Sequence, residues 1–209
     1  MSDPYTICHT CGLSRKYCCK TPHAIFIGIP EAIRIHQKTG LKYSDFIIYT
    51  SFSEEQFREA FVDLIPSGKT IALKRKQNNS CVFHTDDGCR IPYLKPSICT
   101  LFPFWYEQEI YKHTGTIELF VEERECDLIV RMSQFKTMDE KCRLVGCSEV
   151  AVKELIKKLF ENVEIFKIFE NLFEIKDLDT VFEIIEKQYN SIKETPSPSV
   201  FKVVPLEAK

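Results

Sequence analysis

Residues 80–105, SCVFHTDDGCRIPYLKPSICTLFPFW, are the most informative stretch of the sequence, because three cysteines are separated there by turn residues and short apolar runs. The tripeptide Asp86-Asp87-Gly88 predicts a tight turn. The residues on either side of it are expected to pair as a hairpin, with Cys81 and Cys89 near one another across its mouth.

Prolines stiffen the approach to the third cysteine of this stretch, Cys99. One helical turn fits between Pro92 and Cys99, since proline is accepted in the first turn of a helix. The apolar run at 100–105 is expected to pack under the thiols. A dry shell of this kind strengthens thiolate coordination and tunes a redox potential.

A second group of cysteines lies in ICHTCGLSRKYCCK, residues 7–20. Cys8 and Cys11 have the C-x2-C spacing that turns two sulfurs toward one ion, and Gly12 relieves the tight backbone. The adjacent Cys18 and Cys19 converge on one ion only with a special backbone, so the doublet indicates two metals or a multinuclear cluster.

Composition is that of an ordinary globular protein, with 209 residues, 44% hydrophobic and 28% charged, which excludes a disordered or collagenous chain. The formal net charge of −2 shows no basic excess, so no nucleic-acid partner is expected. No secretory signal and no run of about 20 apolar residues is seen, and we expect a cytoplasmic protein without a membrane partner. Ten cysteines in a reducing compartment favour thiolate chemistry over disulfides.

The order of these motifs resembles a known family. C-x2-C-G, CC, C-V-F, D-G-C-R-I-P-Y and K-P-S-I-C-T-L-F-P-F follow one another as in the CxxCxxCC or YkgJ-like cysteine-cluster family, described as a zinc- or iron-chelating domain. The resemblance covers about residues 8–126 and implies that Cys126 belongs to the cluster. This chain departs from the family pattern in a longer gap before the doublet, in Pro92 before Tyr93, in Lys95 and Thr100 in place of arginines, and in Asp127 after the last cysteine.

Spacing and resemblance together predict a metal centre with eight cysteine ligands. These are Cys8, Cys11, Cys18, Cys19, Cys81, Cys89, Cys99 and Cys126. Eight thiolates suit two zinc ions, one or two iron–sulfur clusters, or one cluster and one zinc ion, so ligand number does not separate these cofactors. The resemblance includes members regarded as iron–sulfur proteins, which favours a cluster.

The remaining thiols and the histidines are weaker candidates. Cys142 and Cys147 are expected to be inert thiols, because cysteine is often buried as a small hydrophobe. His9 and His84 are near cysteines, and imidazole suits a mixed site, but we expect His9 to face solvent and His84 to precede a polar turn without ligating. The other histidines have no candidate partner.

Hydrophobic patterns predict an α+β fold, in which a small cysteine-ligated metal or cluster core with short strands and helices is followed by a C-terminal helical segment. Strands are expected at 24–29, 70–76 and 116–122, and helices at 30–38, 44–49 and 53–64. The basic run Lys74-Arg75-Lys76 is expected to be the solvated end of its strand rather than a phosphate site.

Apolar residues three and four apart predict an amphipathic helix from 148 to about 175, broken near Asn162 or Asn171, and a second helix at 179–189. We therefore expect a cysteine-cluster domain at 1–147, helices packed on it at 148–194 and an extended tail at 195–209. The aromatic stripe of these helices is expected to be core or a homodimer face.

The chain contains no Gly-rich phosphate loop, G-x-S-x-G elbow or H-E-x-x-H pair, so the sequence provides no signal for conventional catalysis. Three functions are consistent with the cysteine pattern. The first is a metal-binding protein that handles metals or clusters, transfers electrons, or presents its site to a protein partner. The second is a cluster-dependent protein lysine methyltransferase, because the resemblance extends to flagellin lysine methylase and so implies S-adenosylmethionine. The third is a thiol redox sensor using the doublet Cys18-Cys19, which requires an exposed thiolate.

Overall fold

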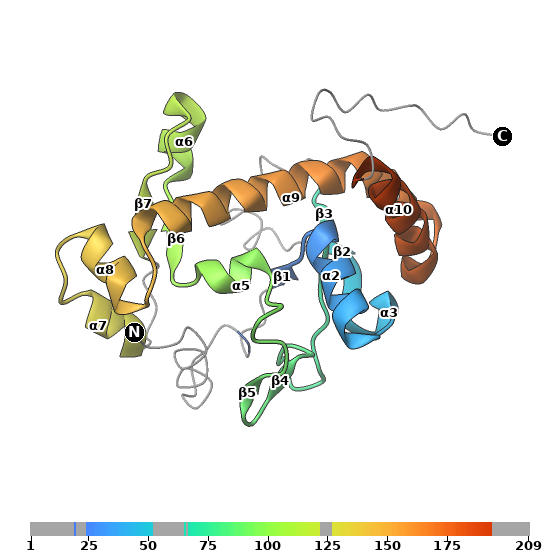
Figure 1. Ribbon diagram of the computed structural model, residues 1–209, viewed down its shortest axis with the longest axis horizontal. Coiled ribbons are helices and arrows are strands. Elements are labelled where there is room, and N and C mark those ends of the chain that lie inside the picture. The colour runs from blue at the N-terminus through green and yellow to red at the C-terminus, as the bar shows by residue number, and fades with distance from the viewer. Residues whose placement is uncertain (1–18, 20–23, 52–64, 66, 122–126, 194–209) are drawn as a thin grey trace.

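The computed structural model describes residues 19, 24–51, 65, 67–121 and 127–193. Short antiparallel strands and several helices pack along one long helix, α9 (Glu149–Ile175), which crosses the upper part of the molecule in Figure 1. The predicted α+β class is confirmed. The helix expected at 53–64 and the tail expected at 195–209 lie outside the described residues.

A three-stranded sheet covers one part of the core. β1 (Ile25–Phe26) and β2 (Ile47–Ser51) each pair antiparallel with the central strand β3 (Lys69–Leu73). Its middle residue Ile71 is fully buried. The strands predicted at 24–29 and 70–76 are therefore present but shorter than expected, and β1 ends early because Gly28 already caps the helix that follows.

Two helices flank β2 in the sequence. α2 (Ile29–Thr39) carries Pro30 in its first turn and ends at Gly40, whose φ of 71° is left-handed, as the proline and glycine predict. α3 (Tyr43–Phe46) is shorter than the helix predicted at 44–49. The second half of that prediction is wrong because Ile47 leaves the helix to pair with β3, where branched side chains pack well.

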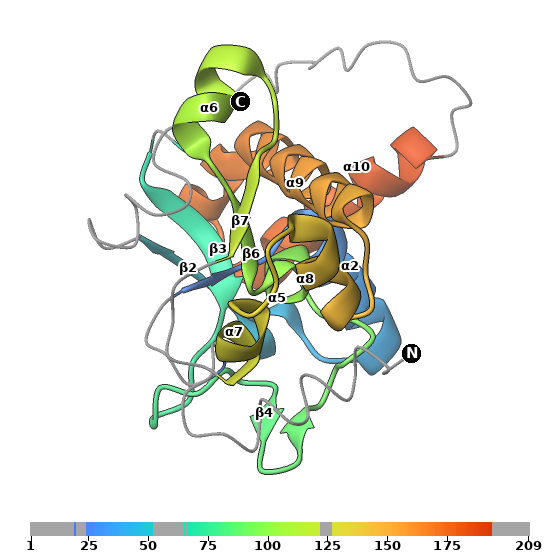
Figure 2. The same cartoon turned by 90° about the vertical axis from the view of Figure 1, so that its left-hand side faces the viewer.

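The cysteine-rich stretch forms a small hairpin and a short helix. β4 (His84–Thr85) pairs antiparallel with β5 (Gly88–Cys89), which confirms the predicted turn between them. α5 (Ser97–Leu101) contains the third cysteine and follows Pro96 rather than Pro92. The hairpin lies at the bottom of the molecule in Figures 1 and 2, whereas α5 packs against α9.

A helical arm extends from the opposite side. β6 (Phe104–Tyr106) and β7 (Leu119–Val121) pair antiparallel, and α6 (Gln108–Thr114) lies between them in the chain. α6 lies at the top in Figures 1 and 2 and contains no buried residue. β7 confirms the third predicted strand in shorter form, whereas α6 was not predicted.

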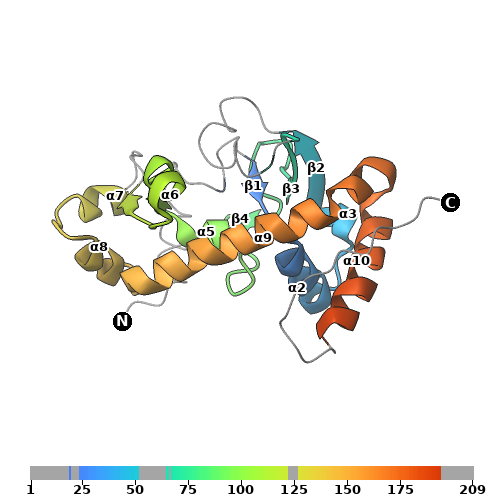
Figure 3. The ribbon, with the colours of Figure 1, turned by 90° about the horizontal axis from the view of Figure 1, so that it is seen from above.

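The C-terminal half is helical. α7 (Asp127–Met132) and α8 (Met138–Leu144) lie at one end of α9, and α10 (Leu178–Lys193) lies at the other, as Figure 3 shows from above. α9 is continuous, so the predicted break is wrong. Asn162 does not interrupt it, because its side chain is buried against Gly28, where an added methyl would overlap it.

One hydrophobic cluster unites these elements. From α9 it contains Val152, Ile156, Leu159, Val163, Phe166, Phe169 and Phe173, together with apolar residues of α2, the sheet, β6 and α10. The apolar stripe of α9 is therefore core, and the cluster spans both sides of the predicted boundary at residue 147. Within the described ranges, no helix is long and apolar enough to cross a membrane.

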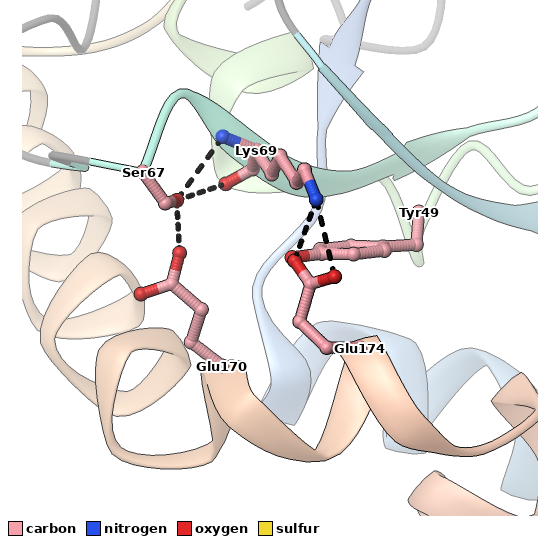
Figure 4. A network of polar contacts seen from close by, with 5 residues as sticks. All are labelled: Tyr49, Ser67, Lys69, Glu170 and Glu174. Atoms are coloured by element: carbon pink, nitrogen blue, oxygen red, sulfur yellow. Dashed lines mark hydrogen bonds and ion pairs between the residues drawn. The ribbon is translucent and has the colours of Figure 1, made fainter.

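A polar network attaches the sheet to α9 at the surface (Figure 4). Lys69 Nζ lies 2.8 Å from Glu174 Oε1, and the Tyr49 hydroxyl donates to the same oxygen at 2.6 Å. Ser67 Oγ donates to Glu170 one turn earlier. The hydrogen bond from Lys69 and, to a smaller extent, the hydrogen bond from Tyr49 hold the pKa of Glu174 below its usual range.

Candidate metal centre

Half of the predicted ligand set belongs to the described part of the chain. Cys19, Cys81, Cys89 and Cys99 are described, whereas Cys8, Cys11, Cys18 and Cys126 lie outside the described residues, together with His9. The geometry of the centre is therefore built from one cysteine of the first group and three of the second.

The two cysteine groups meet at the backbone. The amide of Cys81 donates to the carbonyl of Cys19, with an N···O distance of 2.7 Å. Arg75 joins the same place, because its Nη1 donates to the Cys19 carbonyl at 3.1 Å and its backbone forms an antiparallel bridge with Cys81. Cys19, Arg75 and Cys81 are thus joined by backbone hydrogen bonding beside the positive charge of Arg75.

The basic run after β3 ties this region together. Lys74 Nζ donates to the carbonyl of Ser44, and Lys76 Nζ donates to the carbonyl of His84. With Arg75, all three cations of the run bind backbone carbonyls. The prediction of a solvated strand end is wrong for Lys74 and Arg75, which are half-buried. Each long side chain donates to a carbonyl of a segment that is distant in the chain or that folds back on the run. The position of these carbonyls cannot be predicted from the sequence alone.

His84 is more enclosed than its sequence context predicts. The His84 amide donates to the Cys81 carbonyl at 2.9 Å, which closes a turn over 81–84. Cys89 pairs in register with His84, and the Arg90 amide donates to the Phe83 carbonyl at 2.9 Å, so Cys81 lies two residues before the last of these pairs. The sequence predicted only that Cys81 and Cys89 would lie near one another across the mouth of the hairpin. His84 does precede the turn, as predicted, but it is buried at 6% exposed, beside Cys81 at 5% exposed.

A buried carboxylate positions the helix that carries Cys99. Glu31 Oε1 accepts from the Ser97 amide at 2.7 Å and from the Ser97 hydroxyl, while its Oε2 accepts from the Gly28 amide at 3.0 Å. Glu31 is only 2% exposed. Glu31 is the third residue of α2, where a glutamate that caps the helix start can be recognised from the sequence. Its hydrogen bond with Ser97 at the start of α5 is a tertiary contact, which the sequence analysis missed.

The environment of the described thiols suits soft metal ligands. Cys81 is buried, Cys19, Cys89 and Cys99 are half-buried, and all of them contact the hydrophobic cluster. Cysteine sulfur ligates both zinc and iron–sulfur clusters, so the donor chemistry fits the predicted cofactors. Among the described residues, however, no group of three or more Cys, His, Asp or Glu side chains is arranged to hold a metal ion. Neither the predicted cysteine-ligated core nor its full ligand set is tested by the described residues.

The remaining thiols lie elsewhere in the fold. Cys142 is at the end of α8, and Cys147 lies just before α9. Both contact the hydrophobic cluster, as expected for structural cysteines. His36 stacks on Tyr43 with ring centroids 4.5 Å apart, and its Nδ1 lies 2.7 Å from the Leu41 carbonyl.

Comparison with protein-family models, with curated proteins and with solved structures found no match to this chain.

Proposed function

We propose that this chain is a cytoplasmic metal-binding protein that holds an iron–sulfur cluster or zinc through clustered cysteine thiolates. Its role would be metal or cluster handling or electron transfer. The proposed ligands are the eight cysteines Cys8, Cys11, Cys18, Cys19, Cys81, Cys89, Cys99 and Cys126. The resemblance to the YkgJ-like cysteine-cluster family supports the same proposal.

One observation supports it above the others, namely the backbone hydrogen bond between Cys81 and Cys19. A shared centre requires that cysteines distant in sequence approach one another, and this bond joins the first group to the second. Had Cys19 been far from Cys81, the two groups would need separate centres.

The surroundings of the thiols support the proposal further. Arg75 brings a positive charge to the Cys19 carbonyl, and a nearby cation favours the thiolate form that binds metals. The Glu31 carboxylate accepts hydrogen bonds from Ser97 at the start of α5, so Cys99 lies on a segment whose position is set independently of a metal. When bound, zinc would supply structural cross-linking, and a cluster would supply one-electron redox chemistry.

The test is elemental analysis of the full chain prepared without oxygen, combined with its visible absorption spectrum. We expect zinc or iron in near-stoichiometric amount, with coloured protein if a cluster is bound, since zinc is colourless. Cys89→Ser and Cys99→Ser are each expected to lower the metal content strongly.

Cys147→Ser is the matched control, because it replaces a half-buried cysteine outside the proposed ligand set. It is expected to keep the metal content of the unaltered chain. Anaerobic protein with neither zinc nor iron would contradict the proposal, as would equal loss of metal from all three variants.

A further inference from the structure

The junction between α8 and α9 forms a compact C-terminal turn. The Cys147 amide donates to the Cys142 carbonyl at 3.1 Å, and the Gly146 amide donates to the Arg143 carbonyl at 3.0 Å. Gly146 has a φ of 77°. These two bonds and the left-handed glycine define a Schellman motif, in which the first and last residues of the turn contact each other.

In this protein both contacting residues are cysteines. The Cys147 thiol donates to the Cys142 carbonyl with an S···O distance of 3.3 Å. Cys142 is 0% exposed, whereas Cys147 is half-buried. Neither takes part in a disulfide. The turn therefore holds an inner thiol against an outer thiol that solvent can reach.

We infer that Cys142 and Cys147 form a second thiol site, separate from the proposed metal ligands, that closes to an intramolecular disulfide by exchange with a small disulfide such as oxidised glutathione. The observation that carries this inference is the turn itself, which holds the amide and the thiol of Cys147 against the Cys142 carbonyl before any reaction. It does not depend on the proposed metal centre.

The exchange balances in two steps. The Cys147 thiolate attacks one sulfur of the small disulfide, the disulfide bond breaks, and one small thiolate leaves with the bond electrons. Cys142 then loses its proton, and its sulfur attacks Cys147, releasing the second small thiolate. The protein loses two hydrogen atoms in total, and the small disulfide is reduced to two thiols.

The surroundings favour reaction inside the pair. Burial raises the pKa of the Cys142 thiol to about 12, and burial also raises the pKa of Cys147, so both are protonated at neutral pH and exchange is slow. Once Cys147 carries a mixed disulfide, however, Cys142 is the neighbouring nucleophile, and a preformed geometry gives it a high effective concentration. The disulfide between Cys142 and Cys147 is therefore expected to form before the mixed disulfide accumulates.

The test uses the full chain incubated with oxidised glutathione, blocked with a maleimide, and digested with trypsin. Lys141, Arg143 and Lys153 are cleavage sites, so the disulfide would link the dipeptide 142–143 to the peptide 144–153. We expect mass spectrometry to find this linked pair, with little glutathione on Cys147. In Cys142→Ala, glutathione on Cys147 is expected to rise by about tenfold because the second step is absent.

Gly146→Ala is a second variant that keeps both thiols. A left-handed φ is unfavourable for alanine, so the turn loosens and the linked peptide is expected to decrease. The inference is overturned if wild-type Cys147 accumulates glutathione as fully as in Cys142→Ala. It is also overturned if both cysteines of the unaltered chain remain blocked by maleimide or if either forms a disulfide with another cysteine instead. Circular dichroism of each variant shows whether it is folded.

Discussion

At the scale of single residues, one buried carboxylate organises the approach to the candidate centre. Glu31 accepts three hydrogen bonds, two from Ser97 and one from the Gly28 amide. Buried donors that lose their acceptor retain the full cost of leaving water. The stability of the fold therefore depends strongly on the Glu31 carboxylate.

Glu31→Ala is expected to lower the free energy of unfolding by about 3 kcal/mol or more, because it leaves the buried amides of Gly28 and Ser97 without their acceptor. Urea denaturation followed by circular dichroism measures this change. Glu183→Ala, which removes an exposed carboxylate, is the control and should change the same quantity by less than about 0.5 kcal/mol. Equal effects of the two substitutions would show that Glu31 is not a structural anchor.

At the scale of elements, α10 is attached to α3 by one stacked and one hydrogen-bonded contact. The rings of Tyr43 and Phe182 are parallel within 9°, with centroids 4.0 Å apart. Beside them, Asp179 Oδ1 accepts from the Ser44 amide at 3.0 Å, and its Oδ2 accepts from the Ser44 hydroxyl. Burial alone would raise the pKa of Asp179, but the hydrogen bonds from Ser44 lower it by more. The pKa of Asp179 therefore lies below its usual range.

Acid is expected to weaken this junction. A carboxyl whose pKa is lower in the folded than in the unfolded chain contributes stability above the unfolded value, about 3.9 for aspartate, and loses it as pH falls through the folded pKa. Asp179→Asn should therefore be less stable than wild type at neutral pH, and the difference should shrink toward about pH 3. Urea denaturation at the two pH values measures the difference.

Glu183→Gln, on the same helix, is the control for removing one negative charge from α10. It should not reproduce the pH-dependent difference. A difference between wild type and Asp179→Asn that is constant with pH would mean that titration of Asp179 does not stabilise the junction.

At the scale of the whole molecule, α9 places both ends of the fold in one hydrophobic cluster. Trp105, the chain's single tryptophan, is buried in β6, and Phe182 is fully buried in α10. Both belong to that cluster. Segments that share one core are expected to unfold together, as they do in small single domains, so the predicted boundary at residue 147 is not expected to separate two folding units.

Urea unfolding followed by Trp105 fluorescence and by far-ultraviolet circular dichroism should give coincident transitions. Phe182→Ala should lower the free energy of unfolding by about 3–5 kcal/mol, and both signals should move to the same lower midpoint. If the helical signal shifts while the fluorescence transition stays in place, the C-terminal helices unfold on their own and the single-core description is wrong.

Several elements of this fold could be predicted from the sequence because their signals are local. Pro30 and Gly40 bound α2, the acidic turn before Gly88 produces the hairpin, and Ser148 caps α9. Each acts within one or two turns of backbone. The end of α3 could not be predicted, since Ile47 joins β2 only because β3 is there to pair with it.

The candidate site divides in the same way. Which residues can supply thiolates follows from the sequence alone, since spacing and residue type are properties of the chain, and hydrophobic periodicity predicts the α+β class. The contact of Cys19 with Cys81, the burial of His84 beside Cys89 and the attachment of α5 by Glu31 follow only from the folded arrangement. These contacts join segments far apart in the chain, and their existence depends on how the whole core packs, which no local pattern encodes.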